Sequence, residues 1–237
     1  MTTADQRSSG ADAEAGGDAR HPASAPASVP RFLAFEGPEG GGKSTQIRAV
    51  AAALAGVGVA HIVTREPGGT AIGERIRAIL LGTEHRAMVP KTEALLLLAA
   101  RAQHVAEVIE PALSRGEVVL CDRFAGATFA YQGYGRGLPL AELRQLQAFA
   151  AGALVPDLTL LFDLPVEIGL ARRQAAGDVN RLDAAGLDFH REVRRGYLEL
   201  AHNEPARWRI IDATRPLPEV TAESVSIVAH WLRVNSR

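Results

Sequence analysis

The stretch FLAFEGPEGGGKST, from Phe32 to Thr45, joins an apolar run to a glycine-rich segment that ends in lysine, serine and threonine. Its second part, from Gly37 to Ser44, matches the phosphate-binding pattern G-x-x-x-x-G-K-[ST]. In such a loop the glycines let backbone N–H groups approach phosphate oxygens, and the lysine reaches the outer phosphates. The alternative is a glycine-rich turn that only links a strand to a helix. The phosphate-binding residues that we predict are Gly37, Pro38, Glu39, Gly40, Gly41, Gly42, Lys43, Ser44 and Thr45.

Outward from this stretch, short apolar runs alternate with longer amphipathic ones. The strand-like runs are Arg31–Glu36, Val59–Thr64, Glu117–Asp122, Leu158–Asp163 and Trp208–Asp212. The helical stretches include Lys43–Ala55, Thr92–Leu113, Leu140–Ala151, Glu167–Ala176, Leu187–His202 and a last one that ends near Trp231 and Leu232. Strands that alternate with helices predict right-handed crossovers, and hence a three-layer α/β fold with helices on both faces of a five-stranded parallel sheet. Sites in such sheets lie at the carboxyl ends of the strands.

Composition limits the class of protein. The 237 residues, 47% of them hydrophobic, suit one globular domain, which we expect to span residues 31–237. Residues 1–30 are mostly Ala, Gly, Ser, Asp and Pro, which predicts a disordered tail. The formal net charge of −1 argues against a dedicated nucleic-acid binder, and the only cysteine, Cys121, cannot form an intrachain disulfide. Since no apolar run reaches the roughly 18 residues of a membrane span and no secretion signal is visible, we expect a cytoplasmic protein.

The strand-like runs that end at Asp122 and Asp163 each offer a carboxylate that could hold a metal beside the phosphate loop. The pattern alone does not choose between them. Arg123 favours the first, because an acid–base pair at the end of a strand can hold both Mg²⁺ and a phosphate. The alternative for this pair is an ordinary surface ion pair. We therefore predict Ser44 and Asp122 as the metal ligands.

A cation interrupts the apolar face of the helix expected over Thr92–Leu113. Arg101 lies, by its three-or-four spacing, within a stripe made of Ala94, Leu97, Leu98, Val105, Val108 and Ile109. A buried arginine needs an acceptor, which could be a carboxylate or a bound ligand. A structural ion pair, or a side chain that snorkels to the edge of the helix, explains the pattern equally well.

Taken together, several stretches resemble the thymidylate kinase family, whose members transfer the γ-phosphoryl group of ATP to dTMP. Beside the phosphate loop, these stretches are Thr64–Thr70 (TREPGGT), Ala99–His104 (AARAQH), Asp122–Phe124 (DRF) and Ala130–Leu138 (AYQGYGRGL). The resemblance covers residues 31 to 235. It implies the P-loop kinase fold, ATP and dTMP as substrates, Mg²⁺ as cofactor and a homodimer.

The resemblance also implies roles for single residues. Arg65 and Arg123 would hold the dTMP phosphate, Arg101 would bond the thymine edge, and Asp122 and Glu39 would organise Mg²⁺ and the acceptor phosphate. Taken singly, each has a plainer explanation, such as core packing for a tyrosine or a solvated loop charge for an arginine. The dTMP-binding residues implied are Arg65, Leu97, Arg101, Arg123, Thr128, Tyr131 and Gln132.

One cation in the loop is too little for two or three phosphates. One branch of the family carries an arginine where this chain has Gly40, and the other, mostly bacterial, supplies the arginine from a lid. Residues 172–186 resemble that lid, and Arg172 and Arg181 match its arginines better than Arg173 does. The alternative is a charged helix end without a catalytic part. The catalytic residues predicted are Lys43, Arg123, Arg172, Arg181 and Glu39.

The chain departs from the family pattern at a few positions. Asn180 stands where an aspartate is frequent, Leu97 or Leu98 where an aromatic residue often stacks on thymine, and Ala127 where serine is frequent. None of these removes a group that the chemistry requires.

Three other functions compete with this interpretation. The nearest is another nucleotide or nucleoside kinase on the same fold. A GTP-binding switch would need the guanine motif N-K-x-D, which does not occur in the sequence. A silent binding protein is disfavoured because the loop lysine, the Asp122–Arg123 pair and the lid arginines are all present.

Overall fold

The computed structural model of the chain describes residues 31–177, 180–183 and 185–235. The predicted disordered tail, residues 1–30, lies outside this range. The central sheet has five parallel strands in the order β2-β3-β1-β4-β5. The strands are β1 (Phe32–Glu36), β2 (His61–Arg65), β3 (Val118–Asp122), β4 (Leu158–Asp163) and β5 (Trp208–Asp212). The predicted fold class is therefore confirmed, and strand ends differ from the predicted ones by at most two residues.

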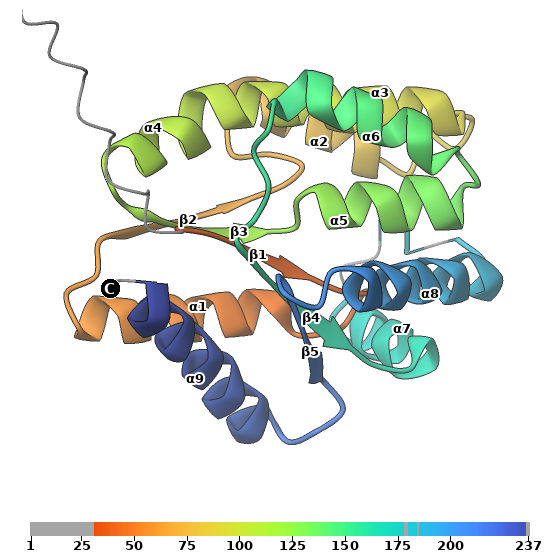
Figure 1. Cartoon of the computed structure of the whole chain (residues 1–237). Coiled ribbons are helices and arrows are strands. Elements are labelled where there is room, and N and C mark those ends of the chain that lie inside the picture. Colours follow the sequence, from red (N-terminus) through yellow and green to blue (C-terminus); the bar gives the residue numbers. More distant parts are fainter. Residues whose placement is uncertain (1–30, 178–179, 184, 236–237) are drawn as a thin grey trace, which may run out of the picture.

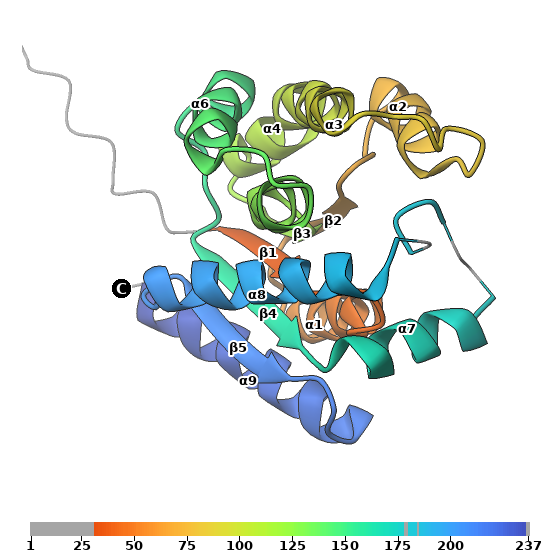
Figure 2. The same cartoon turned by 90° about the vertical axis from the view of Figure 1, so that its right-hand side faces the viewer.

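Helices cover both faces of this sheet (Figure 1). In chain order they are α1 (Lys43–Gly56), α2 (Ala71–Leu81), α3 (Pro90–His104), η1 (Val105–Ile109), α4 (Glu110–Ser114), α5 (Ala125–Thr128), η2 (Phe129–Gly135), α6 (Leu140–Ala151), α7 (Val166–Ala175), α8 (Leu187–Asn203) and α9 (Leu217–Asn235). One core cluster packs α1 and α9 against the sheet, and a second packs η1, α4 and α6 against its other face. Figure 2 shows α2, α3 and α6 together on that second side, with α8 crossing in front of the strands.

The long helix predicted over Thr92–Leu113 is a run of α3, η1 and α4, in which η1 is a π-helical turn. Pro111 lies just after this turn. Because proline has no N–H to donate and its ring crowds the preceding turn of a regular helix, it accounts for the irregular turn at this place. The predicted stripe is buried at Ala94, Leu98, Arg101, Val105 and Ile109 all the same.

Two helical regions were not predicted. Helix α2 begins after Thr70, whose hydroxyl accepts a hydrogen bond from the Gly73 N–H at 2.9 Å. A threonine at the N-cap is a recognised start signal, but Gly73 in the first turn weakens the helical pattern. The turns α5 and η2 carry the AYQGYGRG stretch and pack against α8.

Strand register brings several charged residues to one edge of the sheet. Phe35 of β1 pairs with Asp122 of β3, Arg65 of β2 pairs with the same Asp122, and Glu36 pairs with Leu161 of β4. The phosphate-loop stretch leaves β1 at this carboxyl edge. The edge is therefore where a site is expected in such a sheet.

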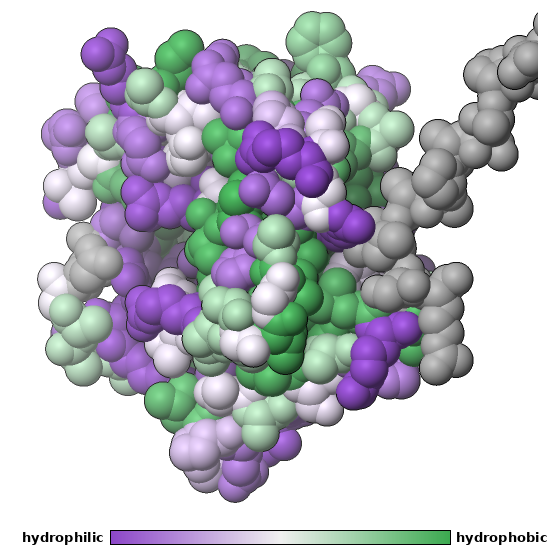
Figure 3. Space-filling view, turned by 90° about the vertical axis from the view of Figure 1, so that its left-hand side faces the viewer, coloured by the Kyte–Doolittle hydropathy of each residue, from purple (hydrophilic) through white to green (hydrophobic). Residues whose placement is uncertain are grey.

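The outer surface mixes polar and apolar residues. Viewed from the left-hand side of Figure 1, hydrophilic residues surround a band of hydrophobic ones (Figure 3). Among the described residues, no helix is long and apolar enough to cross a membrane.

Candidate active site

A cavity of about 640 Å³ opens at the carboxyl edge of the sheet. One end is lined by the phosphate-loop residues Glu39–Thr45 together with Asp122 and Arg123. The other end is lined by side chains from α3, α5 and η2, namely Leu97, Arg101, Thr128, Tyr131 and Gln132. We call these the phosphate end and the base end. Most of the residues predicted from separate stretches of the sequence therefore share one cavity.

Glycine is required at two positions of the loop. Gly37 has φ 140°, and a Cβ there would lie 2.5 Å from the Phe162 carbonyl oxygen. Gly40 has φ 71°, and a Cβ there would lie 2.2 Å from the carbonyl oxygen of Gly169 in α7. Because both contacts are with backbone, neither can be relieved by a side chain that moves. The loop thus runs directly against β4 and α7, and α1 begins at Lys43.

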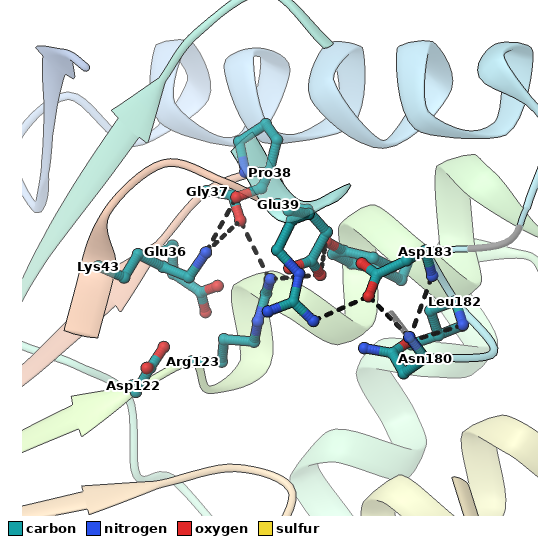
Figure 4. Close-up of polar contacts among 12 residues, drawn as sticks. Glu36, Gly37, Pro38, Glu39, Lys43, Asp122, Arg123, Asn180, Leu182 and Asp183 are labelled. Carbon is teal, nitrogen blue, oxygen red and sulfur yellow. Dashed lines mark hydrogen bonds and ion pairs between the residues drawn. The ribbon is translucent and has the colours of Figure 1, made fainter. Parts of the chain in front are cut away.

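Lys43 folds back onto its own loop. Its buried Nζ donates to the carbonyl oxygens of Gly37 at 3.1 Å and Pro38 at 2.9 Å (Figure 4). Burial and the neighbouring Arg123 lower the pKa of Lys43 to about 8, although three nearby carboxylates oppose this. The ammonium is thus held by neutral acceptors, which a phosphate oxygen could replace.

Ser44 and Asp122 lie side by side, with the Ser44 hydroxyl donating to Asp122 Oδ2 at 3.2 Å. Asp163, the other carboxylate considered from the sequence, is paired with Arg194, which donates to both of its carboxylate oxygens at 2.7 and 2.8 Å. A hydroxyl and a carboxylate beside a phosphate loop are oxygen ligands of the kind that Mg²⁺ prefers, so the residues present fit this ion.

Arg123 is held in a left-handed backbone conformation, with φ 70°, directly after β3. Such a conformation is uncommon for arginine and persists where surrounding contacts fix it. Its guanidinium donates to the Gly37 carbonyl oxygen at 3.1 Å, to the Tyr197 hydroxyl at 2.9 Å and to Glu39 Oε1 at 2.8 Å. It also lies over the Tyr131 ring, 5.0 Å from the centroid. These contacts aim the side chain at the phosphate end (Figure 4).

Glu39 is held as a carboxylate. Burial disfavours its charged form, but Arg123 and Lys43 outweigh burial and keep the pKa of Glu39 at about 2. The Tyr131 hydroxyl also donates to Glu39 Oε1, at 2.9 Å. Glu39 is therefore a fixed negative charge at neutral pH that orients Arg123 and Tyr131.

Glu36, which we did not predict as a functional residue, supports this arrangement from beneath. Its fully buried carboxylate accepts from the backbone N–H groups of Phe124 at 2.9 Å and Ala127 at 3.1 Å, and from the Tyr197 hydroxyl at 2.9 Å. Burial raises the pKa of Glu36 despite the nearby Arg123. Glu36 thus ties the turn that carries Arg123 and α5 to the end of β1.

At the base end, Arg101 is 2% exposed and its acceptors are protein groups. It donates to Glu66 Oε2 at 2.7 Å, to Gln147 Oε1 at 2.5 Å and to the Thr128 hydroxyl at 3.0 Å. Of the two acceptors considered from the sequence, the structure supplies the carboxylate. His104 Nδ1 lies 3.0 Å from Glu66 Oε1, which fixes the carboxylate in turn. Arg101 is therefore immobilised where it lines the cavity.

Gln132, like Arg101, is among the residues that line the cavity, and its two amide atoms differ in their partners. Its Nε2 donates to Glu93 Oε1 at 2.8 Å. Its Oε1 is buried and has no hydrogen-bond partner within the part of the chain that the structure describes. A buried acceptor without a partner is costly, which marks this oxygen as a place for a ligand.

The three arginines of the predicted lid lie in different places, and residues 178, 179 and 184 of that segment are outside the described ones. Arg172 lines the phosphate end and donates to the carbonyl oxygens of Ala213 at 3.0 Å and Gly40 at 3.4 Å. Arg173 also lines the cavity and pairs with Asp183 at 2.8 Å. Arg181 does not line it: its guanidinium is buried and donates to Glu93 Oε2 at 2.6 Å and to the Leu80 carbonyl oxygen at 2.9 Å. The structure thus brings Arg172 to the phosphate loop but not Arg181.

The departure at Asn180 leaves the local turn intact. Its side-chain carbonyl accepts from the backbone N–H groups of Leu182 at 2.8 Å and Asp183 at 3.2 Å, as an aspartate could. Figure 4 shows this turn facing the phosphate loop across the cavity.

Arg65 does not line this cavity either. Half-exposed, it pairs with Glu74 at 2.9 Å and faces a second cavity between α1 and η1. Arg77 of α2, which we did not single out from the sequence, lines the main cavity and donates to the Pro67 carbonyl oxygen at 2.9 Å. No motif marks Arg77, and only its place on the unpredicted helix α2 could have drawn attention to it.

The chain is similar to known proteins over most of its length. A family model described as thymidylate kinase matches residues 35–224. Thymidylate kinase from Pseudomonas savastanoi pv. phaseolicola is 53% identical over 203 residues, which cover 86% of this chain and 97% of the relative. The enzyme of the same name from Thermomicrobium roseum is 56% identical over 195 residues, 82% of this chain and 91% of the relative. That from Pseudomonas fluorescens (strain Pf0-1) is 50% identical over 204 residues, 86% and 97% of the two chains.

Proposed function

This chain belongs to the thymidylate kinase family and phosphorylates dTMP to dTDP with ATP, and we propose that each end of its cavity binds one of the two substrates. ATP places its phosphates on the loop from Gly37 to Thr45. The nucleobase of dTMP occupies the base end, and its phosphate points back toward Arg123. The acceptor oxygen and the γ-phosphorus then meet between Lys43 and Arg123.

One observation carries the assignment of the base. Arg101, a buried donor, and Gln132 both line the cavity, and Gln132 Oε1 has no hydrogen-bond partner among the described residues. Thymine offers O4 as an acceptor and N3–H as a donor on neighbouring positions of one edge, which matches this pair. Leu97 and Tyr131 add apolar contact to the ring, and the Thr128 hydroxyl holds Arg101 in place.

In the reaction, an oxygen of the dTMP phosphate attacks the γ-phosphorus of ATP in line. The bond from that phosphorus to the β,γ-bridging oxygen breaks, and dTDP and ADP are released. The attacking oxygen is already anionic at neutral pH, so no strong general base is needed. Glu39, with a pKa of about 2, is suited to orienting Arg123 and not to accepting a proton. Lys43 and Arg123 neutralise charge and position the phosphates.

Ser44 and Asp122 would hold Mg²⁺ at the phosphate end. When bound, the ion would offset the negative charge of the phosphates. The protein contributes few ligands of its own, as is usual where phosphates complete the shell of this ion.

Arg65 and Arg181 do not have, in this proposal, the roles that the sequence predicted for them. We assign the acceptor phosphate to Arg123 and Arg77, because Arg77 lines the cavity and Arg65 does not. We assign delivery of charge during transfer to Arg172, with Arg173 beside it. Arg181 serves in this proposal to hold residues 180–183 against α2 and α3 through Glu93 and Leu80. A cation that reaches the transferring group stabilises charge as it develops.

A coupled ATP-consumption assay with dTMP, dUMP, CMP, GMP and thymidine tests the function. We expect dTMP to be the best substrate, and we expect chelation of Mg²⁺ to abolish turnover until the ion is restored. Preference for CMP, GMP or thymidine would identify another kinase of the same fold. Binding of ATP without turnover of any acceptor would favour the silent binding protein.

We also propose that the chain forms a homodimer through the side of the molecule formed by α2, α3 and α6 (Figure 2). Ile72, Ile79, Leu95 and Phe149 project from these helices with 41% to 92% of their surface exposed. Exposed apolar side chains on one side are typical of an interface. Light scattering after gel filtration would measure the mass, and a mass of one chain would contradict the proposal. The expected cytoplasmic location stays a prediction.

A further inference from the structure

A buried carboxylate fixes the orientation of the Gln132 amide. Gln132 Nε2 donates to Glu93 Oε1 at 2.8 Å, and both side chains are 1% exposed. An ionised carboxylate has only acceptors, so the amide must turn its NH₂ group toward Glu93. Burial disfavours the charged form of Glu93, but hydrogen bonds from Arg136, Gln132 and Arg181 outweigh burial and lower its pKa. Glu93 thus remains a pure acceptor, and Gln132 Oε1 is left without a partner among the described residues.

Arginines secure Glu93 in this role. Arg136 donates to both of its oxygens at 3.2 Å, and Arg181 donates to Oε2 at 2.6 Å. These partners compensate the charge of the buried carboxylate without using the position that Gln132 occupies. Glu93 is therefore anchored independently of the ligand.

We propose that Glu93 determines which pyrimidine the enzyme accepts, by preventing the Gln132 amide from reversing. The proposal rests on the placement of thymine between Arg101 and Gln132 described above. Glu93 does not touch the substrate in this arrangement, so it is a positioning residue that acts through Gln132.

The chemistry of the two bases explains the effect. Thymine presents N3–H and O4, whereas cytosine presents the N3 lone pair and the N4 amino group. Against cytosine, Gln132 Oε1 would face another acceptor and Arg101 another donor. A free glutamine could remove the first conflict by exchanging its Oε1 and Nε2. Here the reversed amide would place Oε1 against the Glu93 carboxylate, which is also an acceptor. The hydrogen bond gained with cytosine N3 would then be offset by the one lost to Glu93.

The sharpest test compares dTMP with 5-methyl-dCMP, because both bases carry the methyl group and differ only along the edge in question. In Glu93→Gln, residue 93 can either donate or accept, so the Gln132 amide can turn to suit either base. We expect the ratio of kcat/KM for 5-methyl-dCMP to that for dTMP to rise about tenfold, the effect of relieving one unpaired polar contact. Full reversal is not expected, since Arg101 still opposes the N4 amino group.

Arg136→Gln is the matched control. It removes one partner of Glu93 but keeps the carboxylate, so the ratio should stay at the wild-type value. If Glu93→Gln does not fold, the double variant Glu93→Gln/Arg136→Gln, in which a lost positive charge matches the lost negative one, provides the same comparison against Arg136→Gln alone. In a Gln132→Leu background, Glu93→Gln should no longer change the ratio, because the amide through which it acts is gone.

A purely structural role for Glu93 would lower kcat/KM for both nucleotides together, and an unchanged ratio in whichever Glu93 variant folds would overturn the proposal. Wild-type turnover of dTMP is measured first. Its absence would contradict the proposed function itself, whereas the ratio judges Glu93 alone.

Discussion

The two ends of the cavity hold their cations in different ways. At the phosphate end, Lys43 and Arg172 donate to backbone carbonyl oxygens, which are neutral. At the base end Arg101 is paired with the buried carboxylate Glu66, and Arg181, which lies outside the cavity, is paired with Glu93. A carbonyl can be exchanged for a phosphate oxygen without leaving a buried charge unpaired, whereas a carboxylate cannot. The phosphate end is thus suited to changing partners, and the base end to keeping them.

Arg123 combines both arrangements. It donates to the Gly37 carbonyl oxygen and is also paired with Glu39. It lies between the ends, where a group must keep its orientation while a phosphate arrives. The comparison therefore predicts that substitutions at the phosphate end reduce turnover at little cost in stability, and that substitutions at the base end reduce both.

The largest effect is expected for Lys43→Ala. Loss of the ammonium that neutralises the transferred group should lower kcat about 1,000-fold. The partners left behind are two neutral carbonyls and the buried ammonium is itself disfavoured, so the free energy of unfolding should fall by no more than about 1 kcal/mol. Coupled assays and urea unfolding measure the two quantities. An unchanged kcat would contradict the assignment of residues 37–45 as the phosphate-binding loop.

The next effect separates two arginines of one segment. Arg172→Ala should lower kcat about 100-fold with stability retained, since Arg172 lines the phosphate end. Arg181→Ala leaves Glu93 buried with one partner fewer and should lower the free energy of unfolding by about 3 kcal/mol, with a smaller change in kcat. If Arg181→Ala were the more damaging to kcat at full stability, the lid would deliver Arg181 instead. If removal of both left turnover intact, the lid proposal would be wrong.

Arg101→Ala should raise KM for dTMP about 30-fold while ATP binding is retained, because the change is confined to the base end. It should also cost about 3 kcal/mol of stability, since Glu66 loses its ion-pair partner inside the protein. Arg101→Lys is the control, because lysine keeps a positive charge for Glu66 but lacks the planar guanidinium with its several N–H donors. Compared with Arg101→Ala, it should restore most of the stability but less of the dTMP affinity. Equal loss of ATP and dTMP binding would indicate a defect of the fold.

The smallest effect is a pH dependence of the ligand-free protein. The pKa of Lys43 is about 8 when folded, against an ordinary value of about 10.5, so the unfolded chain binds more protons between these two values. Stability should therefore rise with pH there, by about 1 kcal/mol from about pH 8 to about pH 9, relative to Lys43→Met. Because both proteins contain the same other titrating groups, the contributions of those groups cancel in the difference. A difference that stayed flat would mean that Lys43 is not held in the buried position described.

The fold could be predicted largely because its signals are local. Alternating apolar runs give the strands to within two residues, and the loop from Gly37 to Ser44 fixes where the site must lie. Arg101 could be recognised as unusual because helix periodicity alone reveals a cation on a buried face. Short turns such as α5 and η2 have no such period, since tertiary packing against α8 determines them.

The partners of the site residues could not be predicted in the same way. Arg181 is separated from Glu93 by 88 positions, and nothing in the lid sequence tells whether a phosphate or a carboxylate holds it. Arg77 and Glu93 belong to no motif that we used. Their roles follow from which groups the packed helices bring to the cavity wall, a property of the whole fold.

The contact between Gly40 and Gly169 has a consequence for how enzymes of this kind change over time. A side chain at residue 40 would collide with the backbone of α7, and α7 carries Arg172 only three residues beyond that contact. A substitution that adds a side chain at residue 40 would therefore require the backbone of α7 to move, and Arg172 would move with it. The loop and α7 would have to change together.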